Sequence, residues 1–263
     1  MVNKYFTVTV KPDIVNGDIS NIQQADTNDL DVGASDIIFN WTAVDMPKGS
    51  SKLVSVSAMV NAENGVLASG SLTNYELIFA KSVNGVAPRP LGVVNAVQTT
   101  GFNVAPHYVG CYQLSSTAGK GTIQLSRFYV MYLNASAQLY GGTPLVIDLD
   151  PQSGTNVGYD KLYVAGYQTS ARHYGTGVIV NGAITSDTET TITVDGIDAN
   201  KMFEVGDTVY LHDVDTALGT IKSIATDGLS ITLNAAIAGG TNLDDDDELV
   251  NANPIKLILG FEK

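Results

Sequence analysis

Charged side chains are scarce in this chain of 263 residues: Asp, Glu, Lys and Arg together make up only 16% of it. Ordinary soluble domains carry roughly 25%. A folded chain with so few charges must cover much of its outside with small polar and apolar groups. Such a surface is typical of proteins that are held by neighbouring subunits, although extracellular β-modules have similar surfaces. We therefore expect much of the surface to lie in subunit contacts.

Basic residues are the scarcer of the two signs, with 14 Lys and Arg against 27 Asp and Glu and a net charge of −13. Proteins that bind nucleic acid neutralise its phosphates with clustered Lys and Arg, and the sequence contains no such cluster. An acidic surface is also a poor match for anionic lipid. The composition therefore predicts that the chain binds neither nucleic acid nor a membrane.

Cysteine occurs once, at Cys111, which excludes an internal disulfide and a thiolate metal cluster. Its neighbours Val109 and Tyr112 predict a buried, structural thiol. No apolar run is long enough for a membrane-spanning helix, and the first residues lack the charged and apolar regions of a secretory signal. We therefore expect a chain that is made in the cytoplasm and is not processed.

Alternating apolar and polar residues are frequent, and β-branched residues fill these segments, as at 6–10 and 54–60. Asn-Gly pairs, such as Asn16-Gly17, mark tight turns between them. The sequence predicts an all-β chain, with a jelly-roll-like β-sandwich in its first two-thirds. Further strands are expected at residues 37–44, 75–81, 107–114, 128–133, 145–149, 162–167, 178–184, 190–194, 207–212, 220–225 and 230–233.

The distribution of charge predicts two domains. Residues 1–185 hold 12 acids and 10 bases, whereas residues 186–263 hold 15 acids and 4 bases. We expect a β-sandwich for docking and oligomerisation at 1–175 and a small, acidic β-barrel module at 176–263. The apolar segment 254–261 is expected to form a strand that either closes the small barrel or returns to the main sheet.

One predicted strand, 128–133, is apolar at every position. It is either a central strand that is covered on both faces, or a strand with one face in the core and the other in a subunit interface. The second interpretation makes Tyr129, Met131 and Leu133 candidate interface residues. Trp41, the single Trp of the chain, is the fourth candidate.

Five consecutive acids at 244–248 form the densest run of charge. A calcium loop that started at Asp244 would need Gly where Leu249 stands and Glu where Ile255 stands. Adjacent carboxylates of an extended segment also point in alternating directions and cannot all converge on one ion. The run predicts a solvated turn, and a weak calcium contact between subunits is the alternative.

The sequence contains no recognisable catalytic constellation. His107, His173 and His212 have no ligand-type partner at helical or strand spacing, and no G-x-S-x-G elbow is present. Asp148 and Asp150 have the spacing of a paired-carboxylate site, but the residues around them predict the turn that ends a strand. We therefore predict a non-enzymatic protein with no cofactor and no bound metal.

Two groups of segments resemble proteins of tailed bacteriophages. The segments 36–44 (DIIFNWTAV), 47–56 (PKGSSKLVSV) and 76–88 (ELIFAKSVNGVAP) resemble an opening found in structural proteins of marine tailed phages, especially those of cyanobacteria. The segments 205–210, 219–224 and 230–233 look like the small β-modules that decorate phage head and tail proteins.

In those modules the closing strand often carries a turn similar to Gly-Asp-Glu-Leu. Here the corresponding residues are Asp246, Asp247, Glu248 and Leu249, so that Asp246 stands in the place of the Gly. The sequence leaves the geometry of this turn open. The resemblance implies no catalytic residues.

The resemblance implies a structural virion protein, and we expect a capsid decoration or cement protein on the outer surface of the head, made in the host cytoplasm. Its expected partners are the major capsid protein lattice and other copies of the chain, as a homotrimer. A tail or baseplate structural protein is the alternative in the same class. Two further alternatives lie outside this class. One is a carbohydrate-binding or adhesion module, with Trp41 and exposed Tyr side chains stacking on sugars. The other is a hydrolase on a β-scaffold.

Overall fold

The computed structural model describes residues 4–23, 30–46, 49–65, 73–97, 107–116, 122–124, 128–132, 145–149, 161–185, 188–212, 214–237 and 241–263, with the backbone alone at 122–124 and 128–132. In these residues the regular elements are strands and three short 3-10 turns, so the predicted all-β class is confirmed. None of the helical turns in the described part is long and apolar enough to cross a membrane. The 3-10 turns are η1 (Ile19–Ile22), η2 (Glu63–Gly65) and η4 (Ala199–Lys201).

The largest sheet joins the beginning of the chain to its end. Its strand order is β1-β18-β4-β8-β7, and β9 pairs with the first half of β4. All of these pairings are antiparallel. The strands are β1 (Tyr5–Val10), β4 (Gly49–Asn61), β7 (Thr122–Gln124), β8 (Phe128–Tyr132), β9 (Leu145–Leu149) and β18 (Ile255–Glu262).

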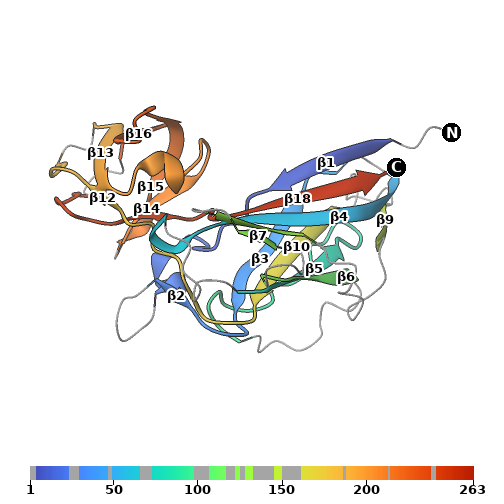
Figure 1. Cartoon of the computed structure of the whole chain (residues 1–263). Coiled ribbons are helices and arrows are strands. Elements are labelled where there is room, and N and C mark those ends of the chain that lie inside the picture. Colours follow the sequence, from blue (N-terminus) through green and yellow to red (C-terminus); the bar gives the residue numbers. More distant parts are fainter. Residues whose placement is uncertain are drawn as a thin grey trace.

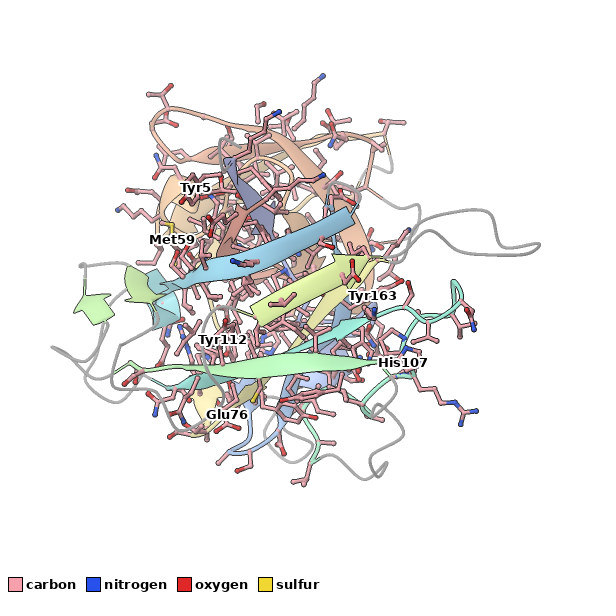
Figure 2. The ribbon with its side chains drawn as sticks, turned by 90° about the vertical axis from the view of Figure 1, so that its right-hand side faces the viewer. Tyr5, Met59, Glu76, His107, Tyr112 and Tyr163 are labelled. Atoms are coloured by element: carbon pink, nitrogen blue, oxygen red, sulfur yellow. The ribbon has the colours of Figure 1, made fainter. Side chains whose placement is uncertain are left out.

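A second antiparallel sheet, in the order β3-β10-β5-β6, faces the first and completes a sandwich. Successive side chains of its strands point to opposite faces of the sheet. In β5, Leu77 and Phe79 are buried, whereas Glu76 is only half-buried. Figure 2 shows Tyr112 of β6 between the two sheets, where its ring meets Phe79 edge-on at 5.8 Å. The strands are β3 (Ile37–Val44), β5 (Tyr75–Lys81), β6 (Tyr108–Leu114) and β10 (Leu162–Gln168), and a separate pair links β2 (Asp31–Val32) to β11 (Arg172–His173).

The third sheet is small and nearly closed. Its order is β12-β13-β16-β15-β14-β17, and a bridge between Ile179 and Glu248 brings its two end strands together. We call this body the small module. The strands are β12 (Val178–Val180), β13 (Thr191–Gly196), β14 (Thr208–Leu211), β15 (Val214–Ile224), β16 (Ser230–Leu233) and β17 (Leu249–Asn251).

The small module lies between β11 and β18 in the chain and beside one end of the sandwich in space (Figure 1). The last strand, β18, belongs to the large sheet, where it lies between β1 and β4. The C-terminus and the first residues of β1 lie at the opposite end of the sandwich. The chain therefore leaves the sandwich to form the module and then returns to it.

Each body has its own apolar core. One cluster fills the sandwich and includes Phe39, Phe79 and Phe261, all of which are fully buried. A second cluster, which includes Ile192 and Ile231, fills the small module. Two cores of this kind are expected when each sheet system buries its own alternating apolar face.

The acidic run forms a turn, as the sequence predicts for these residues. The backbone N–H of Asp247 donates to the carbonyl of Asp244 at 3.3 Å, and Asp244, Asp245 and Asp246 are exposed. Asp246 has a φ of +72°, in the left-handed region that favours glycine. The residue that replaces the Gly of the resembling turns therefore keeps the backbone conformation that a Gly would adopt.

Replacing Asp246 by Gly should leave stability unchanged or raise it by up to about 1 kcal/mol, because Gly adopts a positive φ without the steric cost of a Cβ. Asp244→Gly is the matched control. Asp244 is outside the left-handed region, so the added freedom of Gly should lower stability by about 0.5–1 kcal/mol. Urea unfolding measures both variants, and a loss in Asp246→Gly as large as that in the control would contradict the prediction.

Candidate functional site

The most connected group of charged side chains lies where the small module meets the sandwich. We call Lys11, Glu204, Asp207 and Lys256 the junction cluster. Lys11 follows β1 and Lys256 lies in β18, whereas Glu204 and Asp207 belong to the turn before β14 of the module. The Nζ of Lys11 lies 2.7 Å from Asp207 Oδ1 and 2.9 Å from Glu204 Oε2. The Nζ of Lys256 contacts both oxygens of Glu204, at 3.0 and 2.8 Å.

Asp207 is the buried centre of this cluster, with only 2% of its surface exposed. Its Oδ1 accepts from Lys11, and its Oδ2 accepts from the backbone N–H of Glu204 at 2.8 Å and from Asn251 Nδ2 at 3.1 Å. A buried carboxylate is tolerated only when its lone pairs are satisfied in this way. Asp207 therefore ties the module's own turn to Lys11 of the sandwich.

The ion pairs shift the pKa values of two members of the cluster. Burial lowers the pKa of Lys11, but the hydrogen bonds and negative charges of Asp207 and Glu204 outweigh burial and raise it overall. For Glu204, burial raises the pKa, but the contacts with Lys256 and Lys11 outweigh burial and lower it. Both shifts favour the charged forms of Lys11 and Glu204, which pair with each other at 2.9 Å.

Amide side chains and apolar residues extend the junction below the ion pairs. The carbonyl of Met202, in the module, accepts from Asn61 Nδ2 at 2.8 Å and from Asn251 Nδ2 at 2.7 Å. Beneath them, Tyr210, Val250 and Ala252 of the module pack into the core cluster of the sandwich rather than into that of the module. The two bodies are therefore joined by apolar burial as well as by polar contacts.

A buried arginine anchors the sandwich side of this junction. Arg172, which is 4% exposed, donates from Nη1 to the Tyr75 hydroxyl at 3.0 Å and from Nη2 to the carbonyl of Asn61. Its guanidinium carbon lies 4.9 Å from the centre of the Tyr174 ring, within the range of a cation–π contact. The Tyr174 hydroxyl in turn donates to Gln168 Oε1 at 2.8 Å. Arg172 thus fixes Asn61, the residue whose side chain reaches into the module.

The neck between the two bodies is also held by the last acid of the acidic run. Glu248 Oε1 accepts from the backbone N–H groups of Thr176 and Gly177, at 2.8 and 2.9 Å. Thr176 Oγ1 donates to the carbonyl of Leu249. Asp245 makes a similar contact with the N–H of Gly182 at 2.7 Å. Asp247 Oδ2 also accepts from the backbone N–H of Asp244 at 2.6 Å, so three carboxylates of the run act as backbone acceptors.

A hollow of about 300 Å³ opens at the junction, between the ion pairs and the apolar side chains of Met59, Phe203 and Pro254. The four members of the junction cluster line it and are paired with one another, and Lys201, which also lines it, pairs with Asp198. In the part of the chain that the structure describes, no three His, Cys, Asp or Glu side chains are grouped so that they could hold a metal ion. The contacts in this arrangement serve to hold two bodies together.

No pattern in the sequence points to the junction cluster. Lys11 and Asp207 are 196 residues apart, and each is a single charge next to an apolar strand. A lone charge beside an uncharged strand is a weak signal of a buried ion pair. The sequence offers no way to match the two partners over this distance.

The structure places the four candidate interface residues in different settings. Trp41 is half-buried against Ile37 and Leu91, and its indole N–H donates to the carbonyl of Arg89 at 2.7 Å. Tyr129 and Met131 lie in β8, opposite Val60 and Ala58 of β4. Leu133 is outside the described residues. Trp41 lies on the other sheet of the sandwich, so the structure does not bring it together with β8.

The single cysteine is more accessible than the sequence predicts. Cys111 lies in β6 at the edge of the second sheet and is half-buried, because its side of the strand faces away from the core. A hydrogen bond with Cys111, together with burial, raises the pKa of Tyr108 to about 12. The expectation of a buried thiol was wrong, because Cys111 is half-buried.

Comparisons with known proteins give no family for this chain. No family model matches it, and no curated protein matches it. A solved structure described as "Structure of PNGF-II in C2 space group" is 9% identical, with a TM-score of 0.21. That match covers 98% of this chain and 64% of the PNGF-II chain. A likeness this weak carries no argument about fold or function.

Glu204→Gln should lower stability at neutral pH by up to about 1 kcal/mol, a modest effect because the side chain is 52% exposed. The lowered pKa of Glu204 means that its contribution is present above the ordinary value of 4.5 and is lost as the pH falls through the folded-state value. The difference in stability between wild type and variant should therefore disappear at acidic pH. Thermal unfolding from pH about 3 to 7 measures it. Glu189→Gln, the same change at an exposed residue outside the junction, should give no difference in stability from the wild type. A stability difference between wild type and Glu204→Gln that stays constant with pH would contradict the assignment of Glu204 to these ion pairs.

Arg172→Lys should lower the free energy of unfolding by about 2–3 kcal/mol, because an ammonium group cannot donate to both Tyr75 and Asn61 while stacking on Tyr174. Arg89→Lys, the same change at an exposed loop residue, should cost less than about 0.5 kcal/mol. Urea unfolding compares the two variants. Equal losses would show that the buried network does not stabilise the junction.

Proposed function

We propose that the chain is a non-enzymatic structural component of a tailed-phage virion, and that it serves as a capsid decoration or cement protein on the outer surface of the head. The observation that carries this proposal is the segregation of charge between two joined β bodies. The module, residues 178–251, has 14 acids and 2 bases, and the rest of the chain, which includes β18, has 13 acids and 12 bases. A nearly neutral body suits close packing against a lattice, and an acidic one suits a position facing solvent.

The outer face of the large sheet supports this role. Thr7 and Thr9 of β1 and Ser55 of β4 are exposed, small and uncharged. Gly260 of β18 lies beside Ser55, and a Cβ at Gly260 would come within 2.2 Å of the Ser55 Oγ. This patch of small side chains is uncharged, although Lys52 of β4 and Glu262 of β18 lie farther along the same sheet. Such a patch can be covered by another protein without the loss of hydrated charges.

The junction cluster supports the same function by keeping the module in a fixed position. Lys11 and Lys256 hold Glu204 and Asp207 from the sandwich side, and the apolar contacts of Tyr210 lie beneath them. A fixed module keeps its acidic surface pointing away from the sandwich's contacts, whereas a hinged module would not. In this proposal the sandwich contacts the major capsid protein and other copies of the chain, while the module faces outward.

A second candidate function is a carbohydrate-binding or adhesion module. It is favoured by the aromatic side chains of Tyr108, which is 50% exposed, and of Trp41 and Tyr163, which are half-buried, on strands of the second sheet. Aromatic rings on a β-sheet can stack on sugar rings.

Quantitative mass spectrometry of purified particles of the phage that encodes this chain tests the proposal. A head decoration protein should be present in a simple ratio to the major capsid protein, because it occupies repeated lattice positions. A far lower copy number would favour the tail or baseplate alternative. Absence from the particles, together with glycan-array binding that is lost in Trp41→Ala, would replace the virion role with the carbohydrate-binding one.

A further inference from the structure

We propose that the open edge of β1 pairs with β1 of a second copy of this chain, in antiparallel orientation about a twofold axis at Thr7, and so joins two large sheets into one. The proposal names a surface and a stoichiometry for the self-association proposed above. It rests on that part of the proposed function and not on the virion role.

One side of β1 is fully used, and the other side faces outward. Lys4 and Lys263 exchange two backbone hydrogen bonds, at 3.1 and 2.9 Å, which sets the pattern of the antiparallel ladder. Even-numbered residues of β1 therefore direct their N–H and C=O groups toward β18, and Tyr5, Thr7 and Thr9 direct theirs away from it. Among the described strands, none pairs with this outer side (Figure 1).

This edge lacks the features that normally prevent strand pairing. Natural edge strands carry charged residues, Pro or a bulge. Residues 5–10, Tyr-Phe-Thr-Val-Thr-Val, contain no charge and no Pro, and their register with β18 runs without a shift. Tyr5 is 70% exposed, the most exposed of the large apolar side chains in the described residues. A regular, uncharged, six-residue edge is suited to receiving another strand.

The sequence of β1 is self-complementary when two copies pair about Thr7. Thr7 then lies opposite Thr7 of the second copy, Tyr5 opposite Thr9, and Phe6 opposite Val8. Thr–Thr and aromatic–β-branched pairs are favourable neighbours across an antiparallel ladder. The three outward residues of each strand would form three hydrogen-bonded pairs with about six hydrogen bonds. Phe6 and Val8, which are only half-buried in the single chain, would be covered by the same residues of the partner.

Electrostatics favours the antiparallel orientation. β1 runs toward the small module, because Lys11 directly follows it and contacts Glu204 and Asp207 (Figure 1). In an antiparallel pair the two acidic modules lie at opposite ends of the joined strands. A parallel pair would place them side by side, where like charges repel. Two identical surfaces related by a twofold axis close on themselves, so this contact gives a dimer, in contrast to the trimer expected from the sequence.

Analytical ultracentrifugation of the full chain over a wide concentration range tests the contact. The wild type should form dimers, and Thr7→Lys should weaken them at least about tenfold, because it places two ammonium groups opposite each other at the axis. Thr7→Pro should weaken them similarly without a charge, because the N–H that it removes points away from β18. Thr191→Lys, the same change at an exposed strand residue of the module, should leave the dimer unchanged. Circular dichroism establishes that each variant is folded.

A cysteine at the axis tests the register directly. In a Cys111→Ser background, Thr7→Cys should form a disulfide-linked dimer under mild oxidation, since directly opposed, hydrogen-bonded residues have Cα atoms about 5.5 Å apart. Thr191→Cys in the same background should not. A wild-type chain that is monomeric at every concentration, a trimer, or a dimer that withstands both Thr7 variants would overturn the proposal. None of these results bears on copy number in the particle, which tests the virion role separately.

Discussion

β18 hydrogen-bonds on both of its sides, to β1 through the register from Tyr5–Glu262 to Val10–Leu257 and to β4 through the register from Ile255–Val60 to Glu262–Lys52. The other strands of the large sheet are joined to β1 only through it. Because β18 follows the small module in the chain, the sandwich is incomplete until the module has been made and the chain has returned. The position of the module is therefore constrained at both of its ends, and the junction cluster adds a third point of attachment.

The few ionic side chains of this protein are used where two bodies must be held in register. The described Lys–carboxylate pairs that cross between the sandwich and the module all involve Lys11 or Lys256 with Glu204 or Asp207. Elsewhere the sandwich relies on apolar burial and backbone ladders. Burial of apolar area carries most of the stability, whereas a satisfied buried ion pair contributes more to a specific geometry than to net stability. That division fits a chain in which the orientation of the two bodies has to be fixed.

Much of the fold was predictable from alternation, because a strand with one buried face has a period of two. The segments 37–44, 75–81, 145–149 and 230–233 match strands of the structure at both ends. The two-residue strands β2 and β11 were not predicted, because two residues carry no period. The three-residue strand β17 was not predicted, because it directly follows the acidic run. The first half of β15 was not predicted either, because its exposed residues break the alternation.

The junction could not be predicted for a different reason. Its members are single charges that lie in separate parts of the chain, and the strand order that brings them together depends on β18. The acidic run is the opposite case: its pattern is conspicuous in the sequence, but its members have different roles in the structure. Asp244 and Asp246 are exposed in the turn, whereas Glu248 accepts two backbone hydrogen bonds at the neck. Sequence alone assigns all of these acids to solvent, because it contains no record of which backbone N–H groups need an acceptor.

The junction also determines how the chain can respond to load. A force on the module passes through the neck at Thr176 and Gly177 and through β18, and the junction cluster resists rotation between the two. Rotation would expose Tyr210, Val250 and Ala252 and would leave the Asp207 carboxylate buried without Lys11. Both changes are costly, the first because apolar area returns to water and the second because a buried charge loses its partner. These costs oppose rotation of the module against the sandwich, although each body has its own core.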